Sequence, residues 1–161
     1  MLVPAIYYKD EIEKIFAKNI YNDNYFFYTG YAGCFSLPKI EAVDDHCQWV
    51  SIDNDDKLRG YLAYRIEPLT YSVNSFGLFS FLPDEENNIV LIKDVFDKLE
   101  ELVSIYHRVE WRVISGNHVK RGYDNFCKRH NGNIVCLHDV TRDKYNNYHD
   151  EYIYEIINKK R

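Results

Sequence analysis

The sequence predicts an α/β (α+β) protein, with a mixed, mostly antiparallel sheet of six to seven strands and helices on both faces. Three strand-like segments follow one another between residues 47 and 81, and turns this short imply antiparallel pairing. A long amphipathic helix then separates the third segment from a fourth strand, which makes those two strands a parallel crossover pair. The length of 161 residues fits one domain, 1–161, better than two.

The N-terminal part of the chain begins with a predicted short strand at 2–6. A helix is expected over 9–20, because its apolar residues recur at helical spacing. These residues are Ile12, Ile15, Phe16 and Ile20. The stretch 22–30 is rich in tyrosine and phenylalanine and is expected to form a loop or a short helix.

The three central strands are predicted at 47–52, 58–68 and 71–81. The first two are separated by the turn sequence DNDDK, and Asp and Asn side chains favour turns. Pro68 ends the second strand, because proline offers no donor to the ladder. Gly77 in the third strand has two interpretations: a bulge beside a site, or a gap that makes room for a helix side chain.

The C-terminal half carries the clearest helical pattern. Apolar residues recur at i, i+3 and i+4 through 87–107, which predicts a long amphipathic helix. A strand is expected over 108–114, then a helix over 117–130 that stops at Asn131-Gly132. Two further strands, 133–141 and 148–157, complete the sheet.

Composition excludes several classes of function. The net charge of −5 argues against non-specific nucleic-acid binding, which needs clustered cations. No apolar run approaches the roughly 20 residues of a membrane span, and the N-terminal sequence MLVPAIYYKDEIEK lacks the pattern of a secretory signal. We therefore expect a cytoplasmic protein with no membrane partner. Fifteen tyrosines suit the half-wet surfaces of a site or an interface.

Cysteine and histidine spacing predicts no metal site. The four cysteines are scattered without a CxxC pair, and the six histidines form no H-x-x-x-H pair. Zinc sites read from sequence need closely spaced ligand pairs, so we expect reduced thiols and assign no metal. The absence of G-x-S-x-G and of G-x-x-x-x-G-K-S/T argues against a serine hydrolase and a P-loop NTPase.

Two segments resemble the GNAT (GCN5-related) N-acetyltransferases, and the predicted order of elements resembles that family over nearly the whole chain. DNDDKLRGYLAYRI resembles the family's D-x-D-G-x-x-x-G-Y stretch, and NHVKRGYDNFCKRHNG resembles its N-x-x-A-x-x-x-Y stretch, here one residue shorter. The pyrophosphate loop is atypical. Its place reads LPDEENNIVLIK, with no glycine, and Asp84, Glu85 and Glu86 would repel a pyrophosphate.

The resemblance implies an acetyl-CoA-dependent transfer of an acetyl group to an amine. In this family two neighbouring parallel strands, here near Phe79 and Val113, diverge and aim backbone N–H groups at the thioester oxygen. Tyr123 is then the candidate general acid, because a phenol of pKa about 10 stays protonated at neutral pH. The alternative is that Tyr123 only packs under the sheet. Acetyl-CoA is expected to contact Phe79, Ser80, Phe81, Lys93, Asn117, Lys120 and Phe126.

Three further roles in this scheme have simple structural alternatives. Glu110 is the candidate base, or it forms a cross-strand pair with an arginine, and opposite-charge pairs are common in sheets. Asn117 contacts the donor, or it is only an N-cap. The cations of the helix 117–130 meet the donor's phosphates or form a solvated surface: Lys120, Arg121, Lys128 and Arg129.

The amine acceptor is expected beside Tyr28, Tyr31 and Trp111, as a small molecule or a protein. The family's early helices form the acceptor wall, and aromatic residues there indicate a cavity with apolar sides and hydroxyl tips. A GNAT-like binding module without catalysis is the alternative function, motivated by the acidic loop. The tyrosine-rich last strand either pairs across a homodimer or forms an ordinary sheet edge.

Overall fold

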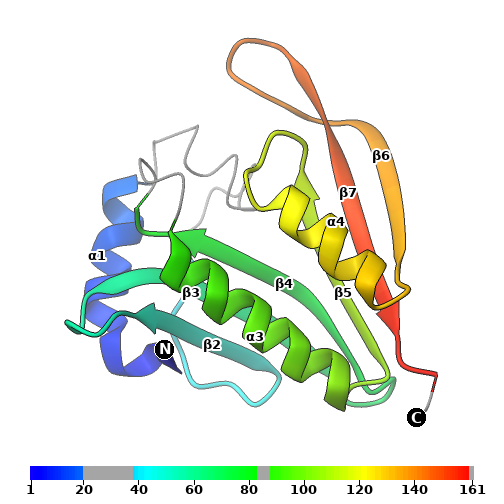
Figure 1. The fold of residues 1–161 in the computed structure, drawn as a ribbon. Coiled ribbons are helices and arrows are strands. Elements are labelled where there is room, and N and C mark those ends of the chain that lie inside the picture. The colour runs from blue at the N-terminus through cyan, green and yellow to red at the C-terminus, as the bar shows by residue number, and fades with distance from the viewer. Residues whose placement is uncertain (20–37, 83–87, 160–161) are drawn as a thin grey trace.

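The computed structural model describes residues 1–19, 38–82 and 88–159 of the chain (Figure 1). The helices and strands follow the predicted order. In chain order they are β1 Leu2–Pro4, the 3-10 helix η1 Ala5–Tyr8, α1 Lys9–Asn19, β2 His46–Ile52, β3 Leu58–Glu67, β4 Ser72–Ser80, α3 Ile89–Ile105, β5 Arg108–Ile114, α4 Lys120–Arg129, β6 Asn133–Arg142 and β7 Tyr148–Ile157.

The strands form one mixed sheet, in the order β1-β2-β3-β4-β5-β7-β6. β4 and β5 are parallel, and the other neighbouring pairs are antiparallel. The predicted meander and the predicted parallel crossover through α3 are both confirmed. β7 lies between β5 and β6, so the last hairpin folds back against the middle of the chain. The expectation that this last strand forms a sheet edge or pairs across a homodimer is wrong, because both of its sides are already paired.

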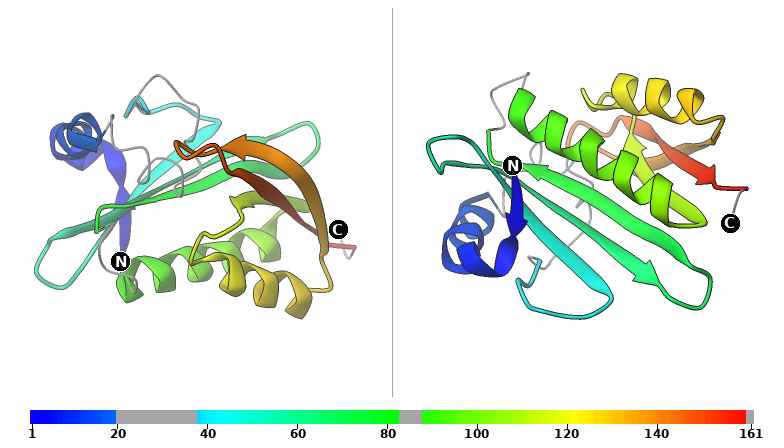
Figure 2. Two further views of the ribbon diagram at one scale, coloured as in Figure 1. Left: turned by 90° about the horizontal axis from the view of Figure 1, so that it is seen from above. Right: turned by 60° about the horizontal axis from the view of Figure 1, so that its bottom comes forward.

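Helices cover both faces of the sheet, as predicted (Figures 1 and 2). α1 packs on one face, where Ile12 and Phe16 are fully buried against the β2–β4 strands. α3 and α4 lie side by side on the other face, which holds the larger core. The apolar stripe of α3 supplies that core with Leu91, Val95, Leu99 and Leu102.

An aromatic cluster holds α4 on β5 and β7. Trp111 of β5 stacks on Tyr154 of β7, with ring centroids 5.3 Å apart. From α4, the rings of Tyr123 and Phe126 meet Trp111 edge-on, at 5.8 and 5.9 Å. All four side chains are at most 3% exposed. Aromatic pairs in such offset and edge-on arrangements add to the free energy gained by burying their area.

Two predicted boundaries were wrong. The first strand ends at Pro4, and η1 replaces its last residues. The helix predicted from Asn117 begins at Lys120, because Gly116 has a left-handed φ of 87° and Asn117 forms a turn before the helix. In that turn the Asn117 Oδ1 accepts a hydrogen bond from the Val119 N–H at 3.0 Å.

Asn88 joins the beginning of α3 to the β3–β4 hairpin. Its Oδ1 accepts a hydrogen bond from the Leu91 N–H at 3.4 Å, and its Nδ2 donates to the Arg59 carbonyl at 2.7 Å and to the Ser80 Oγ at 3.2 Å. The residue is only 7% exposed, so the loss of its amide would leave these partners unsatisfied in the interior.

Replacing Asn88 with alanine is expected to destabilise the protein by about 2 kcal/mol, since it removes an N-cap and two buried hydrogen bonds. In a domain of this size that corresponds to a fall in Tm of about 4–8 °C. Thermal melts followed by circular dichroism test the value. Asn147→Ala, at an exposed turn, is the control, and an equal loss of stability in both variants would contradict the capping role of Asn88.

No helix among the residues that the structure describes is both long and apolar enough to cross a membrane. Cys47, Cys127 and Cys136, the cysteines in those same residues, are free thiols.

Candidate functional site

The parallel strands β4 and β5 pair only over part of their length. Their register ends at Phe76↔Trp111, whereas β4 continues to Ser80 and β5 to Ile114. The two strands therefore diverge toward their C-terminal ends, in the region where the sequence predicts a gap. This divergence is the main geometric feature of the candidate site.

A β-bulge in β4 precedes the divergence. Asn74 and Gly77 of β4 oppose Arg65 and Ala63 of β3, so β4 carries one extra residue between the paired positions. Ser75, inside the bulge, has a left-handed φ of 53°. The prediction of a bulge at Gly77 is thus correct to within two residues. A Cβ added to Gly77 would meet no atom of the described residues within 4 Å, so no helix side chain among those residues occupies a gap at Gly77.

Backbone polar groups of β4 face the gap. The Phe81 N–H donates to the Arg59 carbonyl at 3.1 Å, which marks that position as a hydrogen-bonded pair with β3. Antiparallel ladders alternate hydrogen-bonded and non-hydrogen-bonded pairs. Leu78 and Ser80 therefore turn their N–H and C=O groups away from β3, toward the space that opens between β4 and β5.

Backbone polar groups of β5 also face the gap. The Ser115 N–H donates to the Asp150 carbonyl at 2.8 Å, just beyond the paired strands β5 and β7. By alternation, Arg112 and Ile114 turn their backbone groups away from β7 and toward β4. The gap is consequently bordered by peptide dipoles from both strands.

A cavity of about 570 Å³ occupies this region. Its walls come from residues 74–78 of β4, from Arg108 and 110–114 of β5, and from the segment that leads into α4. Thr141 and Glu151 of the last hairpin also contribute to the lining. Of the predicted site residues that the structure describes, four line this cavity: Tyr123, Glu110, Asn117 and Trp111.

Tyr123 lies in α4 and is 3% exposed. Its ring is enclosed by Phe96, Trp111 and Tyr154, with centroids 5.7 to 5.8 Å away. Burial raises the pKa of the phenol above its ordinary value of about 10. The side chain therefore both packs in the core and borders the cavity, and its proton stays on the oxygen throughout the physiological range.

Burial raises the pKa of three tyrosines in this core: Tyr64, Tyr123 and, with the Asp124 carboxylate beside it, Tyr154. In the unfolded chain these phenols ionise near pH 10. Above that pH the unfolded state loses protons that the folded state keeps, so the free energy of unfolding falls as the pH rises. We expect alkaline unfolding to set in above about pH 10.

This expectation is checked by titrating the tyrosinate absorbance together with the far-ultraviolet circular dichroism. Part of the tyrosinate signal should appear only as the dichroism is lost. A protein whose tyrosines all ionise near pH 10 with native dichroism would contradict the burial of these phenols.

Trp111 borders the cavity and also carries a buried donor. The residue is 1% exposed, and its Nε1 has no hydrogen-bond partner in the described part of the chain. The Nε1 is itself buried, so it does not open onto the cavity. A buried donor without an acceptor is costly.

Glu110 faces away from Trp111, as the strand alternation predicts. Its carboxylate is bound by two arginines of the same strand: Arg108 at 2.5 Å and Arg112 at 3.3 Å. These arginines also reach Glu155 and Glu151 of β7, at 2.7 and 3.4 Å. The predicted cross-strand pair with an arginine is therefore wrong, because the ion pairs of Glu110 run along its own strand and its partner across the ladder is Glu155. Glu110 lines the cavity, and its role as a base stays a prediction.

The other predicted donor contacts lie away from the cavity lining. Phe79 is buried in the core under α1, and Phe81 packs against that same core. Phe126 is buried in the core under α3 and α4. Lys93 pairs with Asp97 at 2.9 Å on the surface of α3, and Lys120 pairs with Asp124 at 2.9 Å. The Ser80 Oγ accepts a hydrogen bond from Asn88. Any contact of these residues with a donor stays a prediction.

Some predictions fall on residues that the structure does not describe. Tyr28 and Tyr31 lie outside the described residues, as do Asp84, Glu85 and Glu86 of the atypical loop.

Sequence reasoning missed two sets of residues. Arg108, Arg112 and Glu151 surround Glu110 at the cavity, and the strand alternation of β5 was the available signal for the two arginines. The second set is formed by Cys136, His138 and Asp150, whose ligand atoms all lie within 4.8 Å of one another. No sequence spacing joins Asp150 to the other two, because the hairpin register brings it there.

No family model and no curated protein matches the sequence. Solved structures do match. An acetyltransferase of the GNAT family from Streptococcus pneumoniae superposes with a TM-score of 0.66, over 98% of this chain and 99% of that chain, at 11% identity. The chain has the GNAT fold. A spermidine/spermine N-acetyltransferase, SpeG from Vibrio cholerae, solved with manganese ions, has a TM-score of 0.55 and 15% identity, over 92% of this chain and 74% of that one.

A third match is a chimera of Vibrio cholerae SpeG and hSSAT, with a TM-score of 0.54 and 16% identity, over 94% of this chain and 78% of that chain. At such identities the likeness establishes the GNAT fold and leaves the chemistry to the residues of the site. The predicted fold class is confirmed.

Proposed function

We propose that this protein is an N-acetyltransferase that moves an acetyl group from acetyl-CoA to an amine. The observation that carries the proposal is the divergence of β4 and β5 beyond Phe76↔Trp111. It opens a cavity bordered by peptide N–H groups, by Asn117 and by Tyr123. The GNAT fold of the chain supports the same reaction class by analogy.

In this proposal the donor lies on the face of the sheet that carries α4. The pantetheine arm passes Asn117, and the thioester oxygen accepts hydrogen bonds from backbone N–H groups of the diverging strands, of which Leu78 and Ser80 are the candidates on β4. Fixed dipoles of this kind stabilise the negative charge that develops on the oxygen during attack.

The transfer then needs one acid and one base. The amine nitrogen attacks the thioester carbon, the C–S bond breaks, and the departing thiolate takes the proton of the Tyr123 hydroxyl. The amine's own proton leaves to Glu110, either directly or through a water. Because Arg108 and Arg112 hold Glu110 in place, we assign the acceptor to the face of the sheet that Glu110 occupies.

The second candidate function is a GNAT-like module that binds a ligand without transferring an acetyl group. Two observations favour it. The Tyr123 ring is enclosed by three aromatic rings, which limits the approach of a thiolate. The stretch that would hold the pyrophosphate carries three carboxylates and no glycine.

Calorimetric titration with acetyl-CoA, together with a thiol-release assay over a panel of small amines and basic peptides, tests both functions. If the protein is a transferase, the heat of acetyl-CoA binding should saturate, and free CoA should be released only when an amine is present. Saturable heat without thiol release supports the binding module. No heat and no thermal shift at millimolar acetyl-CoA would overturn the transferase. We place the reaction in the cytoplasm, on a small or protein amine, and we propose a homodimer paired through the edge strand β6, because β7 is already paired on both sides.

A further inference from the structure

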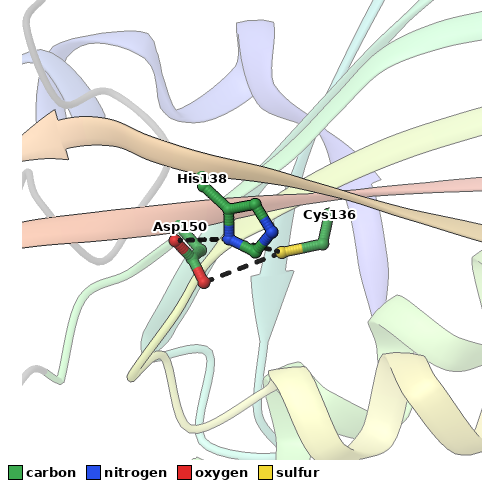
Figure 3. A group of neighbouring side chains, drawn as sticks. All are labelled: Cys136, His138 and Asp150. Atoms are coloured by element: carbon green, nitrogen blue, oxygen red, sulfur yellow. Dashed lines mark hydrogen bonds and ion pairs between the residues drawn. The ribbon is translucent and has the colours of Figure 1, made fainter.

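A second bulge, in the hairpin β6–β7, brings three different metal-binding side chains together. Leu137 pairs with Glu151 and Thr141 with His149, so three residues of β6 oppose a single residue of β7 between these pairs. Asp139, inside the bulge, has a left-handed φ of 56°. The bulge turns the strand locally and places the side chains of the group Cys136, His138 and Asp150 in one spot (Figure 3).

The contacts within this group use both carboxylate oxygens of Asp150. The His138 Nδ1 and the Asp150 Oδ1 are 3.4 Å apart, which exceeds the usual N–H···O range of about 2.7–3.2 Å. The Cys136 Sγ lies 3.8 Å from the His138 Nδ1 and 3.7 Å from the Asp150 Oδ2, at the distances of sulfur hydrogen bonds. One ligand atom from each of the three side chains lies within 4.8 Å of the other two.

A tetrahedral zinc ion requires nearly these separations. With bonds of about 2.3 Å to sulfur, 2.0–2.1 Å to nitrogen and 2.0–2.2 Å to oxygen, tetrahedral angles put the ligand atoms about 3.3–3.6 Å from one another. The 3.4 Å between the His138 Nδ1 and the Asp150 Oδ1 already matches, and the sulfur, within 4.8 Å of both other ligand atoms, must move inward. The His138 side chain is 79% exposed, so a cation can enter from solvent.

We propose that Cys136, His138 and Asp150 bind a divalent cation of the zinc class, with a fourth coordination position open to solvent. A thiolate, an imidazole and a carboxylate form a mixed set that suits zinc and its neighbours in the first transition row, whereas Mg²⁺ and Ca²⁺ prefer oxygen ligands alone. The charges of the thiolate and the carboxylate neutralise the dication. Binding releases the proton of the Cys136 thiol to solvent.

Outer contacts orient the Asp150 ligand. Its Oδ1 accepts a hydrogen bond from the Asp139 N–H at 3.2 Å, and this bond, chief among the causes, lowers the pKa of the carboxyl. The Asp150 backbone N–H donates to the Ser115 Oγ at 3.2 Å. Such outer-shell bonds fix ligating carboxylates in known metal sites. Because Glu151 lines the cavity, a bound cation would also hold that wall in place.

The test uses Co²⁺ as a spectroscopic substitute for zinc, with protein kept reduced by a phosphine that does not chelate metals. Titration should give visible bands of tetrahedral cobalt and a near-ultraviolet thiolate-to-cobalt band that saturate at one equivalent, and one equivalent of Zn²⁺ should displace both. Cys136→Ser should abolish the thiolate band. His138→Gln and Asp150→Asn should weaken Co²⁺ binding by more than the roughly 10- to 100-fold that loss of an outer-shell partner costs.

Cys47→Ser, at a half-buried thiol on β2, is the matched control and should leave the titration unchanged. Thermal melts without metal establish that each variant is folded. A thiolate band that survives in Cys136→Ser, octahedral cobalt bands only, or a stoichiometry that does not saturate would each overturn the site. None of these outcomes depends on acetyl transfer, so the metal site and the proposed function fail independently.

Discussion

Replacing Tyr123 with phenylalanine is expected to lower kcat for acetyl transfer by roughly 10²–10⁴-fold, the usual contribution of a general acid. The structure gives the Tyr123 hydroxyl no hydrogen bond within the described residues, while the ring fills the space between Phe96, Trp111 and Tyr154. Phenylalanine keeps that packing, so the free energy of unfolding should change by less than about 1 kcal/mol. Steady-state thiol release and chemical denaturation of the same variant measure the two quantities.

Tyr154→Phe is the matched control for this prediction. The Tyr154 ring lies 5.8 Å from that of Tyr123, but its hydroxyl donates to the Asp124 carboxylate at 2.8 Å. Its loss should destabilise the protein by about 2 kcal/mol, as expected for a hydrogen bond to a charged group, with kcat nearly unchanged. If Tyr123→Phe retains its turnover, the general acid is another group. If both variants lose only stability, the two phenols are structural.

The fold was predictable because its patterns are local. The apolar stripe on α3 arises because one face of the helix is buried. The pattern of the central strands arises because one or both faces of the sheet are buried. Both periods are visible in the sequence itself. The parallel pairing of β4 and β5 then follows from the helix between them. The beginning of α4 was misplaced because Gly116 and Asn117 form a turn whose side-chain bond to Val119 imitates a helix start.

The site was predictable only where the backbone determines it. Gly77 indicated the bulge, but which residue adopts the left-handed conformation depends on the register with β3, and the structure assigns it to Ser75. Strand alternation correctly placed Glu110 on the face opposite Trp111. The Cys136 group could not be foreseen, because three residues of β6 oppose one of β7 and no short-range pattern encodes that mismatch.

Replacing Gly77 with valine is expected to lower kcat/KM for the amine by at least about 10- to 200-fold, the discrimination that a single methylene group produces in a pocket. Phe76 and Leu78 face the core under α3, so the side chain at Gly77 projects from the opposite face, the face of Glu110. No atom of the described residues lies within 4 Å of a Cβ at Gly77, and its φ is not left-handed, so folding should be unaffected. Kinetics with varied amine and with varied acetyl-CoA separate the acceptor from the donor.

A graded series sharpens this prediction, because a steric effect must grow with volume. Gly77→Ala should have a smaller effect than Gly77→Val, and calorimetric affinity for acetyl-CoA should change much less than kcat/KM for the amine. Gly60→Ala is the contrasting control, since its Cβ would meet the Leu91 Cδ2 at 2.5 Å and destabilise the fold by about 1–3 kcal/mol. Equal losses for donor and acceptor would mean that both substrates share one face of the sheet. Unchanged kinetics in Gly77→Val would show that acetyl transfer does not pass between β4 and β5, and the assignment of the acceptor to the Glu110 face would then fail with it.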